Sequence, residues 1–404
     1  MHLSELYSTS QNTVNKINGS HVSIVSIMKR SISIMLVGGG TGGHFYPLIS
    51  IAEKLVEQDT SLQLHYMGPT PYDANALLTT GITYHYCPAG KRRKYFSLLN
   101  IFDFIKTLFG ICIATIKLYV LYPDIIVSKG GYTSVPVIIG AFILSIPIIV
   151  HESDTRIGSA NKLAMRFARH IAISFTQTSQ FLTLAQQEKT ILTGIPIRTA
   201  LLKGASARAR AVLGVENNLP IILILGGSQG AENINQMILD SLDELLPHYN
   251  IVHQTGVKNF DTTVLSAQGL IQEEDLSKRY IPISFFSDPA IMNDAYSVAS
   301  IIISRAGAGT IYEIASHGKP AILIPIPESV SHDQRTNAYA YAEKGAAIVL
   351  EEGNSTGNLL RSEIERIMQN REEYDSMSAC AQAFAQLDAS SHIAELIFSE
   401  TKKH

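Results

Sequence analysis

A glycine-rich segment near the start of the chain, residues 38–44, combines five glycines with Thr41 and His44. It fits the pattern G-x-G-x-x-G between an apolar run and a helical pattern, where backbone N–H groups can approach an oxygen-rich ligand at a helix N-terminus. His44 is a candidate general base, because a helix N-terminus disfavours the imidazolium form. The alternatives are a turn that only packs a helix on a strand, and a histidine that only hydrogen-bonds this turn.

A dinucleotide is the weaker ligand for this turn. Such a site needs an acidic residue at the end of the second strand to hold the ribose. That strand ends in residues 66–70, Tyr-Met-Gly-Pro-Thr, and carries no acid. The missing acid argues against a NAD-dependent oxidoreductase.

A second glycine turn, residues 226–230 (Gly-Gly-Ser-Gln-Gly), also follows an apolar run. Its N–H groups and the Ser228 hydroxyl could hold a diphosphate. No lysine follows the last glycine, so the segment is not an ATP-binding P-loop. Arg198 could add a charge-assisted contact to a leaving phosphate, and the alternative is a solvated arginine.

A third cluster, residues 304–313, joins an apolar strand to a helix and contains Thr310 and Glu313. Glu313 lies three residues after Thr310, which is the spacing of a capping box. The functional interpretation is a carboxylate that accepts the ribose hydroxyls of a nucleotide. Both interpretations stay open.

A fourth cluster, residues 325–337, is a polar loop followed by a helix that carries Gln334 and Asn337. These amides are three residues apart and share one helix face. Amide groups suit sugar hydroxyls because they both donate and accept. The alternative is an ordinary polar helix start.

Two polar segments, residues 129–132 (Lys-Gly-Gly-Tyr) and 151–154 (His-Glu-Ser-Asp), each follow an apolar strand. Both are expected at the carboxyl edge of the first sheet, where they could line the acceptor side of a cleft. Glu152 and Asp154 are second candidates for a general base.

These clusters need strands and helices to position them, and the chain alternates the two. The expected strands are residues 32–37, 62–67, 125–127 and 146–150 in the first half, and 221–225, 251–254, 301–304 and 321–326 in the second. Helical patterns lie between them, including residues 47–58 and 233–246. The fold class is therefore α/β, with two Rossmann-like, doubly wound parallel-sheet domains that face a cleft.

The 404 residues suit two domains. Gly and Pro at residues 193–196 place the boundary, so residues 28–193 form the first domain and residues 194–385 the second. Residues 1–27 are polar and form either a disordered lead or a mis-assigned start, with Met28 as the other start.

A basic quartet, residues 91–94, precedes an apolar segment that continues to Tyr122. This Lys91–Tyr122 region predicts docking on an anionic membrane, while a core helix is the alternative, favoured from Ile111 onward. Asp103, Lys106 and Lys117 argue against a membrane-spanning helix.

Composition excludes several other classes. A net charge of −3 gives no whole-chain attraction to nucleic acid. Cys87, Cys112 and Cys380 are far apart and form no CxxC pair, so neither a disulfide framework nor a zinc site is indicated, and a reducing cytoplasm fits best. The cleft loops hold no Asp-x-Asp metal motif, so we expect no metal and no cofactor.

With the four clusters in order, the chain resembles the lipid I N-acetylglucosaminyltransferases, the MurG family, from about residue 28 to residue 352. The resemblance implies the GT-B architecture, UDP-N-acetylglucosamine as donor and lipid I, undecaprenyl-diphospho-N-acetylmuramoyl-pentapeptide, as acceptor. It also implies a peripheral location on the cytoplasmic side of the inner (plasma) membrane, and a C-terminal helix within residues 386–404 that returns to the first domain.

The resemblance further assigns roles to individual positions. It implies that Glu313 holds the ribose, that Gln334 reads the sugar hydroxyls, and that the backbone of Phe286 meets uracil. Asp154 stands where the family often has Asn, which bears on an acceptor-side or sugar contact. The remaining family-matched positions are Arg198 and Ser228 for the donor, Ala308, Gly309 and Thr310 for the nucleotide, and Thr41, Gly42 and Gly43 near the diphosphate and acceptor.

The hypothesis for the mechanism is a direct displacement with inversion and release of UDP, with His44 as the candidate base and Glu152 or Asp154 as the second candidates. Two other functions on this scaffold stay open. A UDP-sugar diacylglycerol glycosyltransferase would share the lipid-facing segment. A UDP-N-acetylglucosamine 2-epimerase would need no lipid.

Overall fold

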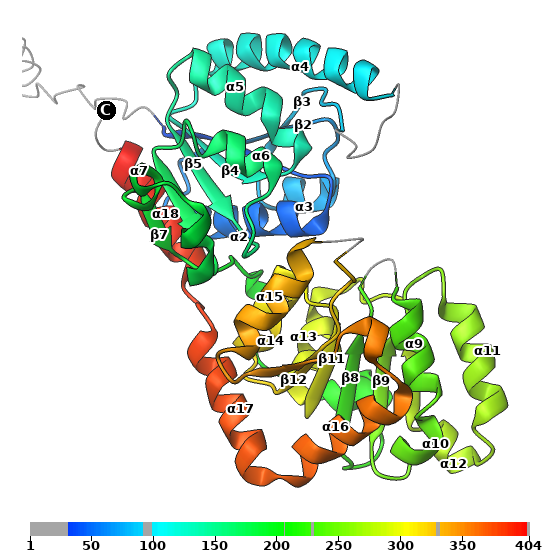
Figure 1. The fold of residues 1–404 in the computed structure, drawn as a ribbon. Helices are drawn as coiled ribbons and strands as arrows, with labels where there is room; N and C mark the ends of the chain where they lie inside the picture. The colour runs from blue at the N-terminus through cyan, green and yellow to red at the C-terminus, as the bar shows by residue number, and fades with distance from the viewer. Residues whose placement is uncertain (1–30, 92–98, 206, 228–229, 329–331, 402–404) are drawn as a thin grey trace, which may run out of the picture.

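The computed structural model describes residues 31–91, 99–205, 207–227, 230–328 and 332–401. They form two α/β domains, one above the other in Figure 1, and each domain is built on one parallel sheet. This architecture confirms the fold expected from the alternating strands and helices.

The first domain has a seven-stranded sheet in the order β3-β2-β1-β4-β5-β6-β7. Its central strands β1, β4 and β5 are buried along their whole length because helices cover both faces of the sheet. The elements are β1 (Ser33–Gly38), α2 (Gly42–Gln58), β2 (Gln63–Gly68), α3 (Ala74–Thr79), β3 (Thr83–Tyr86), α4 (Leu99–Leu121), β4 (Ile125–Gly130), η1 (Tyr132–Ser134), α5 (Val135–Ile143), β5 (Ile148–Glu152), α6 (Ser159–Ala164), β6 (His170–Ile173), η2 (Thr176–Phe181), α7 (Leu184–Gln187) and β7 (Thr190–Leu192).

The second domain has a six-stranded sheet in the order β10-β9-β8-β11-β12-β13, with buried clusters on both faces. Its elements are η3 (Thr199–Leu202), α8 (Ala209–Val212), β8 (Ile221–Leu225), α9 (Glu232–Leu239), α10 (Leu242–Leu245), β9 (Asn250–Gln254), α11 (Phe260–Leu270), α12 (Glu274–Ser277), β10 (Tyr280–Ile283), α13 (Pro289–Val298), β11 (Ile301–Ser304), α14 (Ala308–Ser316), β12 (Ala321–Leu323), α15 (His332–Ala342), β13 (Ala347–Val349), η4 (Glu352–Asn354), α16 (Gly357–Gln369) and α17 (Arg371–Phe384).

Both sheets reverse their strand order next to the first strand of the domain, between β1 and β4 and between β8 and β11. Ligands of such sheets bind outside the carboxyl ends of the strands at this point. The two predicted glycine turns follow β1 and β8 directly. The topology therefore places both turns at ligand-binding edges.

Several expected boundaries were wrong for local reasons. Helix α2 begins at Gly42, five residues before Pro47, because the glycine turn itself supplies the first helical turn. The helix expected over residues 233–246 is split into α9 and α10 around Asp240 and Ser241. Helix α5 runs through Gly140 and ends before Ser145, whose φ is +57°.

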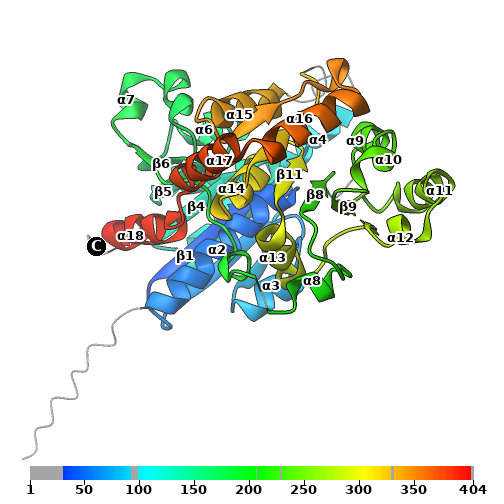
Figure 2. The ribbon, with the colours of Figure 1, turned by 90° about the horizontal axis from the view of Figure 1, so that it is seen from below.

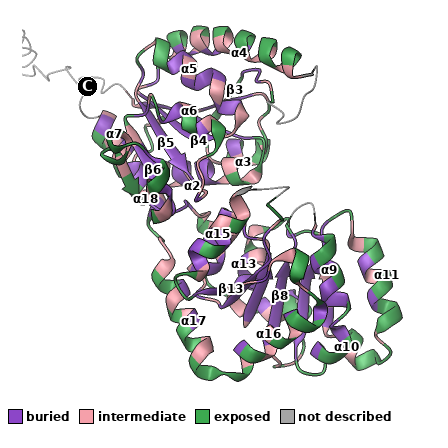
Figure 3. Cartoon of the chain, viewed as in Figure 1, coloured by how far each residue is buried: buried purple, intermediate pink, exposed green. Residues whose placement is uncertain are grey.

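Helix α4 lies on the outside of the first domain and packs along α5 (Figure 3). Ala114 and Leu118 are buried in the domain core. A Cβ added at Gly140 of α5 would lie 3.0 Å from the Thr115 hydroxyl oxygen, so the two helices approach closely there.

The opposite face of α4 is apolar and exposed. Its exposed side chains are Ile101, Phe102, Phe104, Ile105, Leu108, Phe109, Ile116, Tyr119 and Val120. The expectation that residues from Ile111 onward belong to the core is therefore wrong at Ile116, Tyr119 and Val120, because only one face of α4 packs on α5. By length and composition alone, Asn100–Leu121 could cross a membrane, and 17% of its apolar 18-residue window is buried.

The chain returns to the first domain at its end. Helix α18 (Ala389–Thr401) follows α17 and packs on α2 through Ile393, Ala394 and Ile397 (Figures 1 and 2). Its Glu400 is buried and contacts the His170 ring at 3.0 Å and the Arg169 guanidinium at 3.2 Å. The last helix therefore belongs structurally to the first domain.

Candidate active site

The first glycine turn holds His44 in the first turn of α2. The His44 Nδ1 atom lies 2.7 Å from the hydroxyl of Thr41, the residue that precedes the helix. The ring packs beside Gly131, where an added Cβ would lie 3.5 Å from the ring carbon Cδ2. Burial and the Lys129 ammonium lower the His44 pKa to about 4. The imidazole is therefore neutral near pH 7 and able to accept a proton.

Thr41 and Gly43 of the same turn are exposed, and Gly42 is half-buried. A Cβ at Gly42 would come within 3.3 Å of the Tyr46 ring, while a Cβ at Gly43 would meet no heavy atom within 4 Å. The structure thus brings the predicted turn residues together, with open space at Gly43 for a ligand.

Glu152 is 4% exposed and accepts three hydrogen bonds. The donors are the Asp154 N–H at 3.1 Å, the Gly158 N–H at 3.0 Å and the Asn161 amide at 3.0 Å. Burial and the neighbouring Asp154 raise the Glu152 pKa to about 7. These donors use the carboxylate to hold the loop after β5, which favours a positioning role for Glu152 over that of a second base.

A cavity of about 200 Å³ lies at the carboxyl edge of the second sheet. The second domain contributes most of its lining, and Tyr46 contributes from the first. The Arg198 guanidinium stacks over the Tyr46 ring at 4.5 Å. The residues that argue for a ligand here are Tyr46, Arg198, Gly227, Phe286, Tyr296, Arg305 and Thr310. A cation, a glycine turn and a helix start on one cavity suit a phosphorylated nucleotide.

Glu313 lies behind this cavity. Its carboxylate accepts a hydrogen bond of 2.8 Å from the Tyr296 hydroxyl. Burial raises the Glu313 pKa, while that hydrogen bond and Arg198 oppose the rise. Helix α14 begins at Ala308 after Gly307, so Glu313 is in the second helical turn and does not cap it. The capping-box interpretation was therefore wrong.

The three positions at the start of α14 differ in what they offer. Ala308 is buried and packs with Phe175 and Tyr312 between the domains, so only its backbone is available. A Cβ at Gly309 would meet no heavy atom within 4 Å, so its surface is open. Thr310 lines the cavity.

The Phe286 side chain is buried at the cavity wall, and its N–H donates to the Gln254 side-chain oxygen at 3.1 Å. The Phe286 backbone is the one expected to meet uracil, and its N–H is already used in this internal hydrogen bond. The Gln334 oxygen accepts from the Ile326 N–H at 3.3 Å, which ties α15 to the strand end before it.

Asn337 was expected to contact sugar hydroxyls together with Gln334, but the structure places it elsewhere. Its side chain is fully buried, and its oxygen accepts from the Thr155 N–H at 2.8 Å and the Thr155 hydroxyl at 2.9 Å. Its amide nitrogen donates to Asp154 at 2.8 Å. The prediction that Asn337 reads sugar hydroxyls is therefore replaced by a contact between the domains.

Some predicted residues lie outside the described part of the chain, notably Ser228 and residues 92–94 of the basic quartet. The aromatic cavity residues Tyr46 and Tyr296 were not predicted, because each stands in an apolar helix and resembles a core residue. Within the described ranges, no group of three or more His, Cys, Asp or Glu side chains is placed to hold a metal ion.

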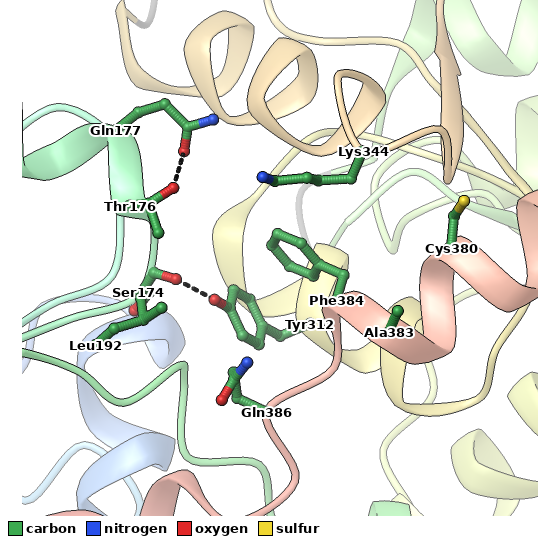
Figure 4. Close-up of a pocket in the computed structure, with 10 residues that line it drawn as sticks. All are labelled: Ser174, Thr176, Gln177, Leu192, Tyr312, Lys344, Cys380, Ala383, Phe384 and Gln386. Carbon is green, nitrogen blue, oxygen red and sulfur yellow. Dashed lines mark hydrogen bonds between the residues drawn. The ribbon is translucent and has the colours of Figure 1, made fainter.

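A larger cavity of about 300 Å³ lies on the side of the domain connections, between Ser174, Leu192 and Gln386 (Figure 4). Tyr312 crosses it and donates to the Ser174 carbonyl. None of the predicted site residues lines this cavity. The smaller cavity, where the predicted residues converge, is therefore the candidate donor site.

Comparisons with known proteins identify the family. Residues 34–173 match the glycosyltransferase family 28 N-terminal domain, and residues 221–393 match the family 28 C-terminal domain. A UDP-N-acetylglucosamine–N-acetylmuramyl-(pentapeptide) pyrophosphoryl-undecaprenol N-acetylglucosamine transferase from Clostridium tetani is 35% identical over 343 residues, covering 84% of this chain and 91% of that protein.

The chain belongs to the MurG family of glycosyltransferases. A family member from Legionella pneumophila is 32% identical over 86% of this chain and 92% of its own length. The crystal structure of Acinetobacter baumannii MurG superposes with a TM-score of 0.69 at 26% identity, covering 91% of this chain and 99% of that one. The protein is thus an enzyme with the GT-B fold of the MurG family.

Proposed function

We propose that the enzyme transfers N-acetylglucosamine from UDP-N-acetylglucosamine to the 4-hydroxyl of lipid I, which gives lipid II for peptidoglycan synthesis. The observation that carries this proposal is the cavity lined by Arg198, Gly227 and Thr310, with Glu313 behind it and the His44 turn on the other domain. The names of the relatives support the choice of donor and acceptor.

The donor would lie on the second domain. Arg198 and the glycine turn would hold the diphosphate, because a guanidinium and backbone N–H groups both bind phosphate oxygens. Glu313 would accept the ribose hydroxyls, with Tyr296 fixing the carboxylate. Gln334 would read the sugar hydroxyls.

The chemistry would be a single displacement with inversion. The 4-hydroxyl oxygen of the acceptor forms a bond to the anomeric carbon, the bond from that carbon to the phosphate oxygen breaks, and UDP leaves. When His44 Nδ1–H donates to the Thr41 hydroxyl, Nε2 carries the lone pair that takes the proton. Arg198 and the second glycine turn would stabilise the charge that develops on the diphosphate.

Helix α4 would dock on the cytoplasmic face of the membrane that contains the acceptor. Its exposed apolar face, from Ile101 to Val120, supports interfacial binding. Its other face packs on α5, which supports a helix that lies on the bilayer rather than one that crosses it. The enzyme would therefore be peripheral at the inner (plasma) membrane.

The test is turnover of UDP-N-acetylglucosamine with a lipid I analogue in detergent. We expect transfer to lipid I, no transfer to diacylglycerol, and no UDP-N-acetylmannosamine in the absence of lipid. Product from diacylglycerol alone, or soluble epimerisation, would overturn the proposal in favour of the corresponding alternative.

His44→Ala tests the base. Loss of a positioned base lowers kcat by roughly 10²–10⁴-fold, while UDP binding should hold because the donor site lies on the other domain. Unchanged turnover with intact UDP binding would remove His44 from the mechanism.

A further inference from the structure

Lys129 is a buried cation at the end of β4. It is 2% exposed, and its Cβ lies beneath the first glycine turn, 2.8 Å from where a Cβ on Gly38 would stand. Its Nζ contacts His151 Nδ1 at 2.6 Å and also the Ser153 hydroxyl. His151 Nε2 lies 2.7 Å from the Gly194 carbonyl, which can only accept, so Nε2 carries the proton and Nδ1 accepts from Lys129.

An ammonium group buried among neutral partners needs a nearby negative charge. Glu152 and Asp154 are the carboxylates that act on Lys129. Burial lowers the Lys129 pKa to about 8, and both carboxylates oppose this change. Glu152 has the larger influence on the Lys129 pKa, but three donors already hold its carboxylate. Burial and Asp333 raise the Asp154 pKa, while the Asn337 hydrogen bond and then Lys129 oppose the rise. The Lys129 Nζ contacts the hydroxyl of Ser153, the residue next to Asp154, so each of the two charges favours the other.

Asp154 also joins the two domains. It accepts from the amide of Asn337 on α15, whose oxygen accepts two hydrogen bonds from Thr155. These three bonds fix the orientation of the Asn337 amide. Gln334 lies one turn earlier on the same helix. A continuous path thus runs from Lys129 through Ser153 and Asp154 to the helix that carries Gln334.

We propose that Lys129 and Asp154 form a charge pair that positions α15 against the first domain, with Asn337 as the link, so that the donor sugar and the acceptor meet in register. Lys129 is then a positioning residue of the transfer reaction. The inference rests on the proposed function, because it takes α15 as the helix that reads the donor sugar.

A double-mutant cycle tests the pair. Lys129→Met, Asp154→Asn and the double variant are compared with the wild type in kcat and in the Kd for UDP. Each single change removes one charge and leaves the other uncompensated, so we expect each to lower kcat by about tenfold or more. The double variant should have a kcat about tenfold higher than the value expected if the two single effects multiplied. Losses that simply multiply would overturn the charge pair.

A second experiment exchanges the donor and the acceptor of the Asn337–Asp154 hydrogen bond. It tests the proposal if Lys129→Met does not fold. Asn337→Asp places two carboxylates face to face and should lower kcat with little change in UDP binding. Combining it with Asp154→Asn restores one donor and one acceptor, so we expect about tenfold recovery over Asn337→Asp alone. No recovery contradicts the link.

The wild-type assay separates the two proposals. A wild type that transfers no N-acetylglucosamine overturns the proposed function, and the same variants read by thermal unfolding then decide the charge pair. Additive losses in an active wild-type background overturn the pair and leave the proposed function standing.

Discussion

Buried imidazole rings in both domains are kept neutral by their surroundings. His253 is fully buried on β9, where its Nδ1 contacts the Tyr280 hydroxyl at 2.9 Å and its Nε2 contacts the Asn235 oxygen at 3.0 Å. Burial lowers its pKa from 6.5 to about 3. His151 is shifted in the same direction by burial and by Lys129. Buried neutral histidines of this kind make the free energy of unfolding fall as the pH is lowered.

We expect the second domain to lose stability as the pH falls below about 6.5, because the unfolded state then binds a proton that the folded His253 site refuses. The loss continues down toward pH 3, where the folded site also titrates. His253→Gln keeps a donor and an acceptor but cannot titrate, so it should flatten the dependence of the melting temperature on pH between 7 and 5. His248→Gln, at an exposed position of the same domain, is the control and should leave the slope unchanged.

Glu313 offers a second test at the scale of one residue. Replacing the carboxylate by an amide in Glu313→Gln removes a charge-assisted acceptor, a change that corresponds to roughly 10–100-fold in affinity. We expect KM for UDP-N-acetylglucosamine to rise by that order with a smaller change in kcat. Tyr296→Phe, which removes the donor to Glu313, should move KM in the same direction and less. An unchanged KM in Glu313→Gln would exclude the ribose assignment.

At the scale of elements, α4 combines a packed face with an apolar face that nothing in the described chain covers. Phe104→Ser with Phe109→Ser removes two large exposed rings without touching Ala114 or Leu118. Because burial of one such side chain contributes about 1.5–3 kcal/mol, we expect binding to vesicles with anionic lipid to weaken by at least tenfold, with no change in melting temperature.

The matched control for this experiment replaces two exposed leucines elsewhere, Leu184→Ser on α7 and Leu265→Ser on α11. It should leave vesicle binding intact. Equal weakening in both double variants would mean that general surface hydrophobicity, and not α4, determines membrane binding.

The elements also mark how far the sequence could predict this structure. The strand-glycine-helix turns around His44 and Thr310 are local patterns, and the expected strands 221–225 and 301–304 were confirmed residue by residue. Short strands such as β7 escaped prediction because their few residues carry no alternation. The role of Asn337 could not be predicted, since its partners Asp154 and Thr155 are more than 180 residues away in the chain.

At the scale of the whole molecule, α18 completes the first domain from the far end of the chain. Ile393 is fully buried against the α2 side of the first sheet. Ile393→Ala should lower the stability of the first domain by about 2–5 kcal/mol, seen as faster hydrogen exchange in β1 and α2. UDP binding and exchange in β8 and β11 should stay unchanged, and Leu387→Ala, at an exposed position before α18, should have no effect.

The two chain crossings between the domains run beside each other, since a Cβ on Gly194 would collide with the Gln386 side chain. The second domain is thus inserted into the first, between two chain crossings that lie side by side. A short peptide that joins Thr193 to Asp388 would delete the second domain and still allow α18 to pack on α2. Vesicle binding by the first domain alone would then show how much of the proposed membrane affinity remains without the second domain.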